Sequence, residues 1–410
     1  MHKGAKGIRE GDHSSATHLL SSLIKHEGLS KEARFTAYNA QGRIFKGAEK
    51  YAEAVKSYSE ALTINDKEAN AWTERGDCYR YLRNYNSAIS DVSTAILVNP
   101  NNARALTIRG ASRLSLDNWG EAKSDLVEAV RLRPRYAWAL VLLGYCYRIT
   151  NNRVEAMQVI QEAINASPKY KWAYLERGYL LTASKRYKEA LDDCSAILAI
   201  DPAYFGALHL QADIYCILHQ FNRGLEKLNA VIESAPNTHQ PKLFYAEMVA
   251  HQGNYEHAIK ILRDLYPKLQ DVDSRKFYRS TLGLIQSYMG KYEEAVNNHE
   301  QLATDSDWGL AARYNIAVSL AQWKGLAYAE IHIEMVTQEL NLRSRAGPDS
   351  VSLYGLAGLS CVKGDTEKAL LLLSEAIEIE LRVILWARHD IAWNTLRQNI
   401  RFQELINTSF

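Results

Sequence analysis

A repeat of constant length constrains this chain more than any other feature. Small residues and prolines recur at steps of 34 residues, in three interleaved series. The series are Pro100, Pro134, Pro168, Pro202 and Pro236; Gly42, Gly76, Gly110, Gly144, Gly178, Ala212 and Ala246; and Ala54, Ala88, Ala122, Ala156, Ala190, Gly224 and Ala258. A chain of 410 residues would otherwise suggest two to four separate domains. The period predicts instead a chain of repeated supersecondary units.

The period defines ten copies when each copy is numbered from position 1 to position 34. The copies start at Phe35, Ala69, Ala103, Ala137, Lys171, Phe205, His239, Lys276, Leu310 and Ser350. Small insertions interrupt the period near 266–275 and 344–349. The sequence therefore predicts a repeat array over 35–383. We expect an N-terminal capping helix or half repeat in 1–34, and a C-terminal capping segment in 384–410.

Each copy carries the pattern of two helices. Apolar residues fall at helical spacing on both sides of a polar turn near position 15, which predicts an antiparallel pair of helices, A and B. Position 8 is Gly or Ala in all ten copies and position 20 is Ala in nine, so the two backbones can approach closely. An aromatic residue at position 17 opens helix B in most copies, and proline at position 32 ends it. One hairpin cannot bury its apolar face alone, so the copies must stack into an all-α solenoid.

This pattern resembles the tetratricopeptide repeat (TPR) family. The residues that carry the resemblance are Trp72, Gly76, Tyr79, Ala88, Ala95 and Pro100 in copy two, and Leu140, Leu143, Gly144, Tyr147, Ala156, Ala163 and Pro168 in copy four. The resemblance covers 35–383. It implies a right-handed superhelical α-solenoid of about ten helix hairpins with capping helices at both ends. The last residues are similar to the tails that close some bacterial arrays of this family.

Arginine at position 7 and aspartate at position 23 occur together in three copies, and neither occurs in the other seven. The pairs are Arg75 and Asp91, Arg109 and Asp125, and Arg177 and Asp193. Positions 7 and 23 lie opposite each other in a hairpin that turns near position 15. We therefore predict ion pairs within these copies, each worth about 0.2–1 kcal/mol if exposed.

Composition excludes several classes of function. The 49 basic and 47 acidic side chains leave a formal charge of +2, which gives no long-range field for nucleic acid or an anionic membrane. The five cysteines are dispersed, which argues against disulfides and zinc and favours a reducing compartment. We see no transmembrane run or signal peptide in this chain, and expect a cytoplasmic location. No catalytic or nucleotide-binding motif is present, so we expect no enzymatic activity, no cofactor and no metal.

The inner face of the solenoid is where we expect a partner. In this family, positions 2, 5, 9 and 12–13 of helix A line that face. Copies two to five place an aromatic and basic set there: Arg80, Tyr81, Arg104, Trp138, Tyr145, Arg148, Trp172 and Tyr179. Tryptophan, tyrosine and arginine are enriched in binding hot spots. The set predicts a groove for a protein or peptide with apolar, aromatic and acidic side chains. The alternative is that these residues pack between neighbouring helices, or lie under the N-terminal segment or another subunit.

Three functions follow from this interpretation. We favour a scaffold or adaptor that holds a partner peptide or protein segment in the concave groove. The alternative is a structural subunit that associates through its ends or its convex face, and the sequence leaves the oligomeric state open. RNA binding inside the solenoid is disfavoured, because Asp77, Asp213 and Glu247 place negative charge on the inner face.

Overall fold

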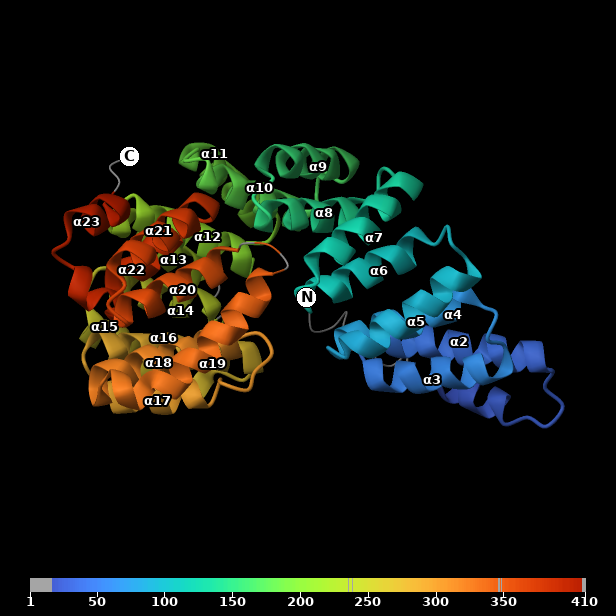
Figure 1. Cartoon of the computed structure of the whole chain (residues 1–410). Coiled ribbons are helices and arrows are strands. Elements are labelled where there is room, and N and C mark those ends of the chain that lie inside the picture. The colour runs from blue at the N-terminus through green and yellow to red at the C-terminus, as the bar shows by residue number, and fades with distance from the viewer. Residues whose placement is uncertain (1–16, 235, 238, 346, 348, 408–410) are drawn as a thin grey trace. The chain divides into compact units, whose positions relative to one another are not determined.

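The chain folds into helices that follow the 34-residue period. The computed structural model describes residues 17–407 except 235, 238, 346 and 348 (Figure 1), and contains no strand within them. The chain divides into two compact units, Met1–Cys146 (unit 1) and Tyr147–Phe410 (unit 2). The division falls inside α8 (Ala137–Ile149).

Unit 1 begins with helical residues 17–24, which belong to the helix expected before the first copy. Residues 11–16 of that expected helix lie outside the described residues. The hairpins that follow consist of α2 (Lys31–Gly47), α3 (Tyr51–Ile64), α4 (Ala69–Tyr81), α5 (Tyr85–Val98), α6 (Ala103–Leu114) and α7 (Trp119–Leu132). Helices A of successive copies, α2, α4 and α6, contact one another and form one wall of the unit.

Unit 2 continues the same alternation and ends in short helices. Its elements are α9 (Arg153–Ala166), α10 (Lys171–Ala183), α11 (Tyr187–Ile200), α12 (Phe205–Ile217), α13 (Phe221–Ser234), α14 (Gln240–His251), α15 (Tyr255–Leu265), η1 (Tyr266–Lys268), α16 (Val272–Tyr288), α17 (Tyr292–Glu300), α18 (Gly309–Lys324), α19 (Leu326–Ser344), α20 (Ser350–Val362), α21 (Thr366–Ile379), α22 (Val383–His389), η2 (Ile391–Leu396) and α23 (Ile400–Ile406). The structure is thus an all-α solenoid, as the repeat predicts.

The start of helix B is set by the turn before it. In all ten copies of the described chain, helix B begins at position 17, as predicted. The turn residue at position 15 has a positive φ in nine copies, and in six of these it is not glycine: Glu49, Arg83, Asp117, Asn151, Lys185 and His219. The next residue then donates its amide to the carbonyl at position 11, as Asn84 does to Tyr79 at 2.9 Å. This bond satisfies a carbonyl at the end of helix A.

The small residue at position 8 lies against the side chain at position 24 of the same copy. A Cβ atom added at Gly42 would stand 2.8 Å from the Tyr58 ring, and one at Gly76 would stand 2.7 Å from Val92 Cγ1. Such distances are shorter than van der Waals contact, so no side chain fits there without a shift. The position 24 side chains are themselves buried, with Val92 fully so. The predicted close approach of helices A and B is confirmed.

The predicted ion pairs within copies are confirmed too. Arg75 Nε lies 2.7 Å from Asp91 Oδ2, and Arg109 and Arg177 reach their aspartates at 2.7 and 2.6 Å. The aspartate side chains are only 5–7% exposed, so these are not surface pairs. Asp91 and Asp193 would be buried, unpaired charges without their arginines, whereas Asp125 would keep Arg113, whose Nη1 lies 2.5 Å from Asp125 Oδ2. Losing the arginine therefore costs more than the figure for an exposed pair.

The C-terminal residues pack tightly on the last repeats. Trp393 and Phe402 are fully buried, and their rings stack with centroids 5.2 Å apart. The carboxylate of Asp390 accepts hydrogen bonds from the hydroxyls of Tyr314 and Tyr354, at 2.8 and 2.6 Å. These bonds attach the end of the chain to α18 and α20.

The buried ion pairs give the first prediction. Arg75→Leu leaves the Asp91 carboxylate buried without its partner, so we expect the free energy of unfolding to fall by about 2–4 kcal/mol. The double variant Arg75→Leu/Asp91→Leu removes both charges and should recover to within about 1 kcal/mol of the wild type. Equilibrium urea unfolding measures both. A double variant as unstable as the single one would contradict this account.

A buried histidine gives the second prediction. His299 takes the position 24 place in copy eight, against Gly283, and neither ring nitrogen has a hydrogen-bond partner among the described residues. Burial lowers the pKa of His299 to about 4. The unfolded chain therefore binds the proton more readily, and stability should fall as the pH drops from about 7 to 4.

The variant His299→Leu removes this titration and supplies the aliphatic side chain that most other copies have at position 24. We expect it to be more stable than the wild type at pH 5, with a smaller loss of stability between pH 7 and pH 4, by about 2–3 kcal/mol. Thermal unfolding followed across that range by circular dichroism tests this. Equal pH dependence in the two proteins would show that His299 is not responsible.

Candidate functional site

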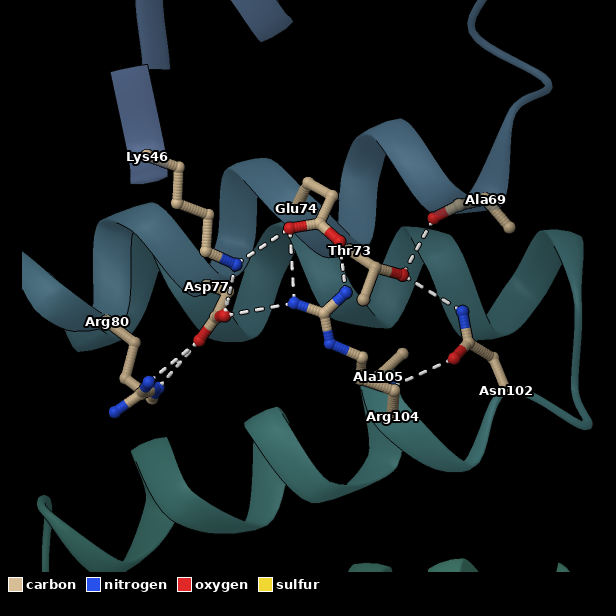
Figure 2. Close-up of polar contacts among 9 residues, drawn as sticks. All are labelled: Lys46, Ala69, Thr73, Glu74, Asp77, Arg80, Asn102, Arg104 and Ala105. Carbon is tan, nitrogen blue, oxygen red and sulfur yellow. Dashed lines mark hydrogen bonds and ion pairs between the residues drawn. The ribbon is translucent and has the colours of Figure 1, made fainter. Parts of the chain in front are cut away.

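A network of charged side chains links three successive helices A in unit 1. Lys46 on α2 reaches two carboxylates of α4, with its Nζ 2.7 Å from Glu74 Oε2 and 2.5 Å from Asp77 Oδ2. Arg104 on α6 contacts the same two, with Nη2 3.1 Å from Glu74 Oε2 and 3.1 Å from Asp77 Oδ2. Figure 2 shows Glu74 and Asp77 between the two cations. The network therefore fixes the wall that α2, α4 and α6 form.

Both carboxylates of the network are ionised at neutral pH. Burial alone would raise the pKa of Glu74, but hydrogen bonds from Arg104 and Lys46 outweigh it and lower the pKa. Burial likewise opposes the charge of Asp77, and the attraction of Lys46 and Arg80 lowers its pKa. Together with Arg80, the set contains three cations and two anions. One positive charge is therefore left over on this wall.

Aromatic rings extend the wall from Arg80. Its guanidinium donates from Nε and Nη2 to Asp77 Oδ1, at 3.0 and 2.8 Å (Figure 2). The guanidinium carbon lies 4.2 Å from the centroid of the Tyr81 ring and 5.4 Å from that of Trp138. Tyr81 also stacks on Tyr51, with centroids 4.5 Å apart and planes within 6°. Arg80 is thus held between a carboxylate and two rings.

Three of the eight predicted partner-binding residues lie on this wall, Arg80, Tyr81 and Arg104, and a fourth, Trp138 of α8, contacts it through Arg80. Tyr81 is 48% exposed and the Arg104 side chain 38%, so solvent reaches both. Tyr145, also in unit 1, is half-buried. Sequence reasoning missed the role of Lys46 and Glu74. The sequence does contain a signal for this contact. Lys46 and Glu74 are 28 residues apart, and the same spacing separates Arg148 from Glu176, which are also in contact.

The other three predicted residues lie together in unit 2, and two of them bind one buried carboxylate. Arg148 Nε donates to Glu176 Oε2 at 2.9 Å, and Trp172 Nε1 donates to Oε1 at 3.0 Å. The guanidinium of Arg148 lies 5.1 Å from the centroid of the Tyr179 ring. Glu176 is 3% exposed. The polar groups of Arg148 and Trp172 therefore already have a partner in this chain, and the Tyr179 ring contacts Arg148.

Residues 379–382, at the junction between α21 and α22, lie beside Arg148 and Tyr179. Arg382 Nη1 stands 3.3 Å from Asp213 Oδ2 on α12. A cavity of about 20 Å³ remains where Arg148 and Tyr179 meet Arg382 and its neighbours. That space holds about one water molecule. In unit 2, residues near Arg382 thus occupy the place beside Tyr179.

In the described part of the chain, no group of three or more histidine, cysteine, aspartate or glutamate side chains has an arrangement that could hold a metal ion. None of the helices described has the length and apolar character that crossing a membrane requires.

Comparison with known proteins identifies the repeat. Models of the tetratricopeptide repeat match residues 35–68, 69–102 and 109–171. A search of curated proteins gives no match. Repeats of this family generally serve as non-catalytic modules for protein interaction.

Several solved structures are similar over part of the chain. The MamA protein is 21% identical and covers 40% of this chain and 90% of its own, with a TM-score of 0.35. YrrB, described as a TPR protein with an unusual peptide-binding site, is 20% identical over 42% of this chain and 89% of its own, with a TM-score of 0.35. PilF of Pseudomonas aeruginosa is 18% identical over 54% of this chain and 98% of its own, with a TM-score of 0.45.

These likenesses to solved structures carry no conclusion about function. The identification comes from the family-model matches, together with the helix hairpins that recur in register along the described chain. On this evidence the chain contains tetratricopeptide repeats, which the family models match over residues 35–102 and 109–171.

Proposed function

We propose that this protein is a non-catalytic scaffold that holds a partner peptide or protein segment against the wall formed by α2, α4 and α6. The observation that carries the proposal is the charged network across these helices, which fixes Arg80 and Arg104 while Tyr81 and Arg104 stay accessible. Side chains that are already ordered lose little conformational entropy when a partner binds.

The composition of the wall supports a partner with both acidic and apolar side chains. The network retains one positive charge, and the Arg104 side chain is 38% exposed, which leaves it within reach of a partner's carboxylate. Tyr81 and Trp138 supply apolar surface on either side of Arg80. Aromatic residues and arginine are the commonest anchors in protein interfaces. Tyr145 belongs to the same proposed surface.

Arg148, Trp172 and Tyr179 form a second proposed contact area. Arg148 and Trp172 bind Glu176, and the residues near Arg382 lie beside Tyr179. A partner that used this area would have to displace residues 379–382 from it. We therefore propose that the partner binds mainly to the wall in unit 1.

The cysteines support the proposed cytoplasmic location. All five, Cys78, Cys146, Cys194, Cys216 and Cys361, are buried, and Cys78, Cys194, Cys216 and Cys361 are free thiols. Burial also raises the pKa of Cys78, Cys146 and Cys194 to about 12. Free thiols in such numbers are typical of proteins in a reducing compartment.

The test uses a partner captured by the wild type and mapped to a synthetic peptide. Tyr81→Ala and Arg104→Ala each remove an accessible anchor, and we expect the double variant to bind the peptide about 30-fold more weakly or worse. Fluorescence anisotropy measures the change in Kd.

The matched control is Leu97→Ala, because Leu97 is 83% exposed on α5, outside the wall. It should leave the Kd of the peptide unchanged. Circular dichroism establishes that all variants are folded. Wild-type affinity in a folded Tyr81→Ala/Arg104→Ala variant would overturn the assignment of the wall.

A further inference from the structure

Helix α19 is apolar on two opposite faces. One face packs into unit 2 through Ala329, Ile333, Val336 and Leu340, each at most 1% exposed. The other face carries a second apolar row: Tyr328 is 55% exposed, Ile331 64%, Met335 58% and Leu342 64%. A helix on the surface of a globular protein normally turns polar residues outward. The second row, here called the outer stripe, is therefore largely open to solvent within the described chain, and Tyr328 contacts Lys324, whose Nζ lies 4.6 Å from the ring centroid.

The outer stripe follows the spacing of a coiled-coil seam. Its members are separated by three, four and seven residues, and Gln338 completes the series. With 19 residues, α19 is also the longest helix in the described part of the chain, where helices B such as α5 have 14. Exposed apolar residues elsewhere, such as Leu97 and Val154, do not form a row of this length. A heptad row on a long helix is the usual signal for pairing with another helix.

We infer that the outer stripe pairs with the same stripe of a second copy of this chain, in antiparallel orientation. We place the two-fold axis perpendicular to α19, at the level along the helix that lies midway between residues 336 and 337. This places Ile331 opposite Leu342 of the second copy, and Met335 opposite Gln338. Tyr328 then lies opposite Arg345, which suits a cation–π contact. The stripe is therefore complementary to itself, as a two-fold interface requires.

The flanking charges select the antiparallel orientation. In that orientation His332 lies beside Glu339 of the second copy, and Glu334 lies beside Asn341. No like charges meet. In a parallel pair the flanking positions would bring Glu334 beside Glu339 of the other chain. Arg313 of the same chain pairs with Glu339 and reduces the repulsion between the two carboxylates without providing a partner for Glu334.

The size of the stripe sets the expected strength. Residues 328–345 span about 27 Å at 1.5 Å per residue. One pair of helices of that length buries less surface than a permanent dimer interface. We therefore expect a dimer that forms at micromolar concentration and dissociates on dilution.

Sedimentation velocity of the full chain between about 1 and 100 µM tests the dimer. The wild type should shift from monomer to dimer over this range. Ile331→Lys/Met335→Lys puts charge into the seam and should weaken dimerisation at least about tenfold. The matched control is Leu97→Lys/Val154→Lys, which charges two residues that are at least 80% exposed on other helices and should dimerise like the wild type.

Cysteine cross-linking tests the orientation. Ile331→Cys and Leu342→Cys proteins, mixed and oxidised, should form a disulfide-linked dimer that contains one chain of each kind. The native thiols are buried and should not form disulfides in this experiment. Linking of Ile331→Cys to itself in place of the mixed dimer would overturn the antiparallel register. A wild-type protein that stays monomeric at every concentration would overturn the proposal of self-association. The outer stripe would then be a contact surface for a different protein.

Discussion

The close approach of two helices within each repeat is the constraint on which the rest of this structure depends. A glycine or alanine at position 8 lets the side chain at position 24 press against the backbone of helix A. At Gly42, Gly76 and Gly110 an added Cβ atom would come within 2.8 Å of that side chain. Protein interiors tolerate so little extra volume that the packing fixes the distance and rotation of each hairpin. Each later copy then meets its neighbour with the same faces.

Because the hairpins share one geometry, a residue's position in the repeat determines its surroundings. Position 7 faces position 23, so arginine and aspartate pair there in three copies. Position 12 faces position 6 of the next copy, so Lys46 meets Glu74, and Arg148 meets Glu176. The charged wall of unit 1 is a consequence of this second relation. Its binding role is proposed because the same contacts that order its side chains leave Tyr81 and Arg104 within reach of a partner.

The sequence predicts what happens inside one repeat and little of what happens between distant repeats. The start of every helix B, the turn at position 15 and the three arginine–aspartate pairs all follow from residues at most 34 positions apart. Arg382 and Asp213 are separated by 169 residues, and no periodicity relates them. The packing of residues near Arg382 beside Tyr179 could not be predicted for that reason. The eight candidate residues share repeat positions and residue types, and neither property indicates that they divide between unit 1 and unit 2.

Direct contact with the wall of unit 1 is the central claim, and site-specific photo-cross-linking measures it. A photoreactive amino acid in place of Tyr81 would report contact with the wall, and one in place of Leu97 would report contact with the exposed side of α5. The account predicts that the bound partner is cross-linked from position 81 and not from position 97. Cross-linking from position 97 alone would place the partner on the opposite surface and contradict the account.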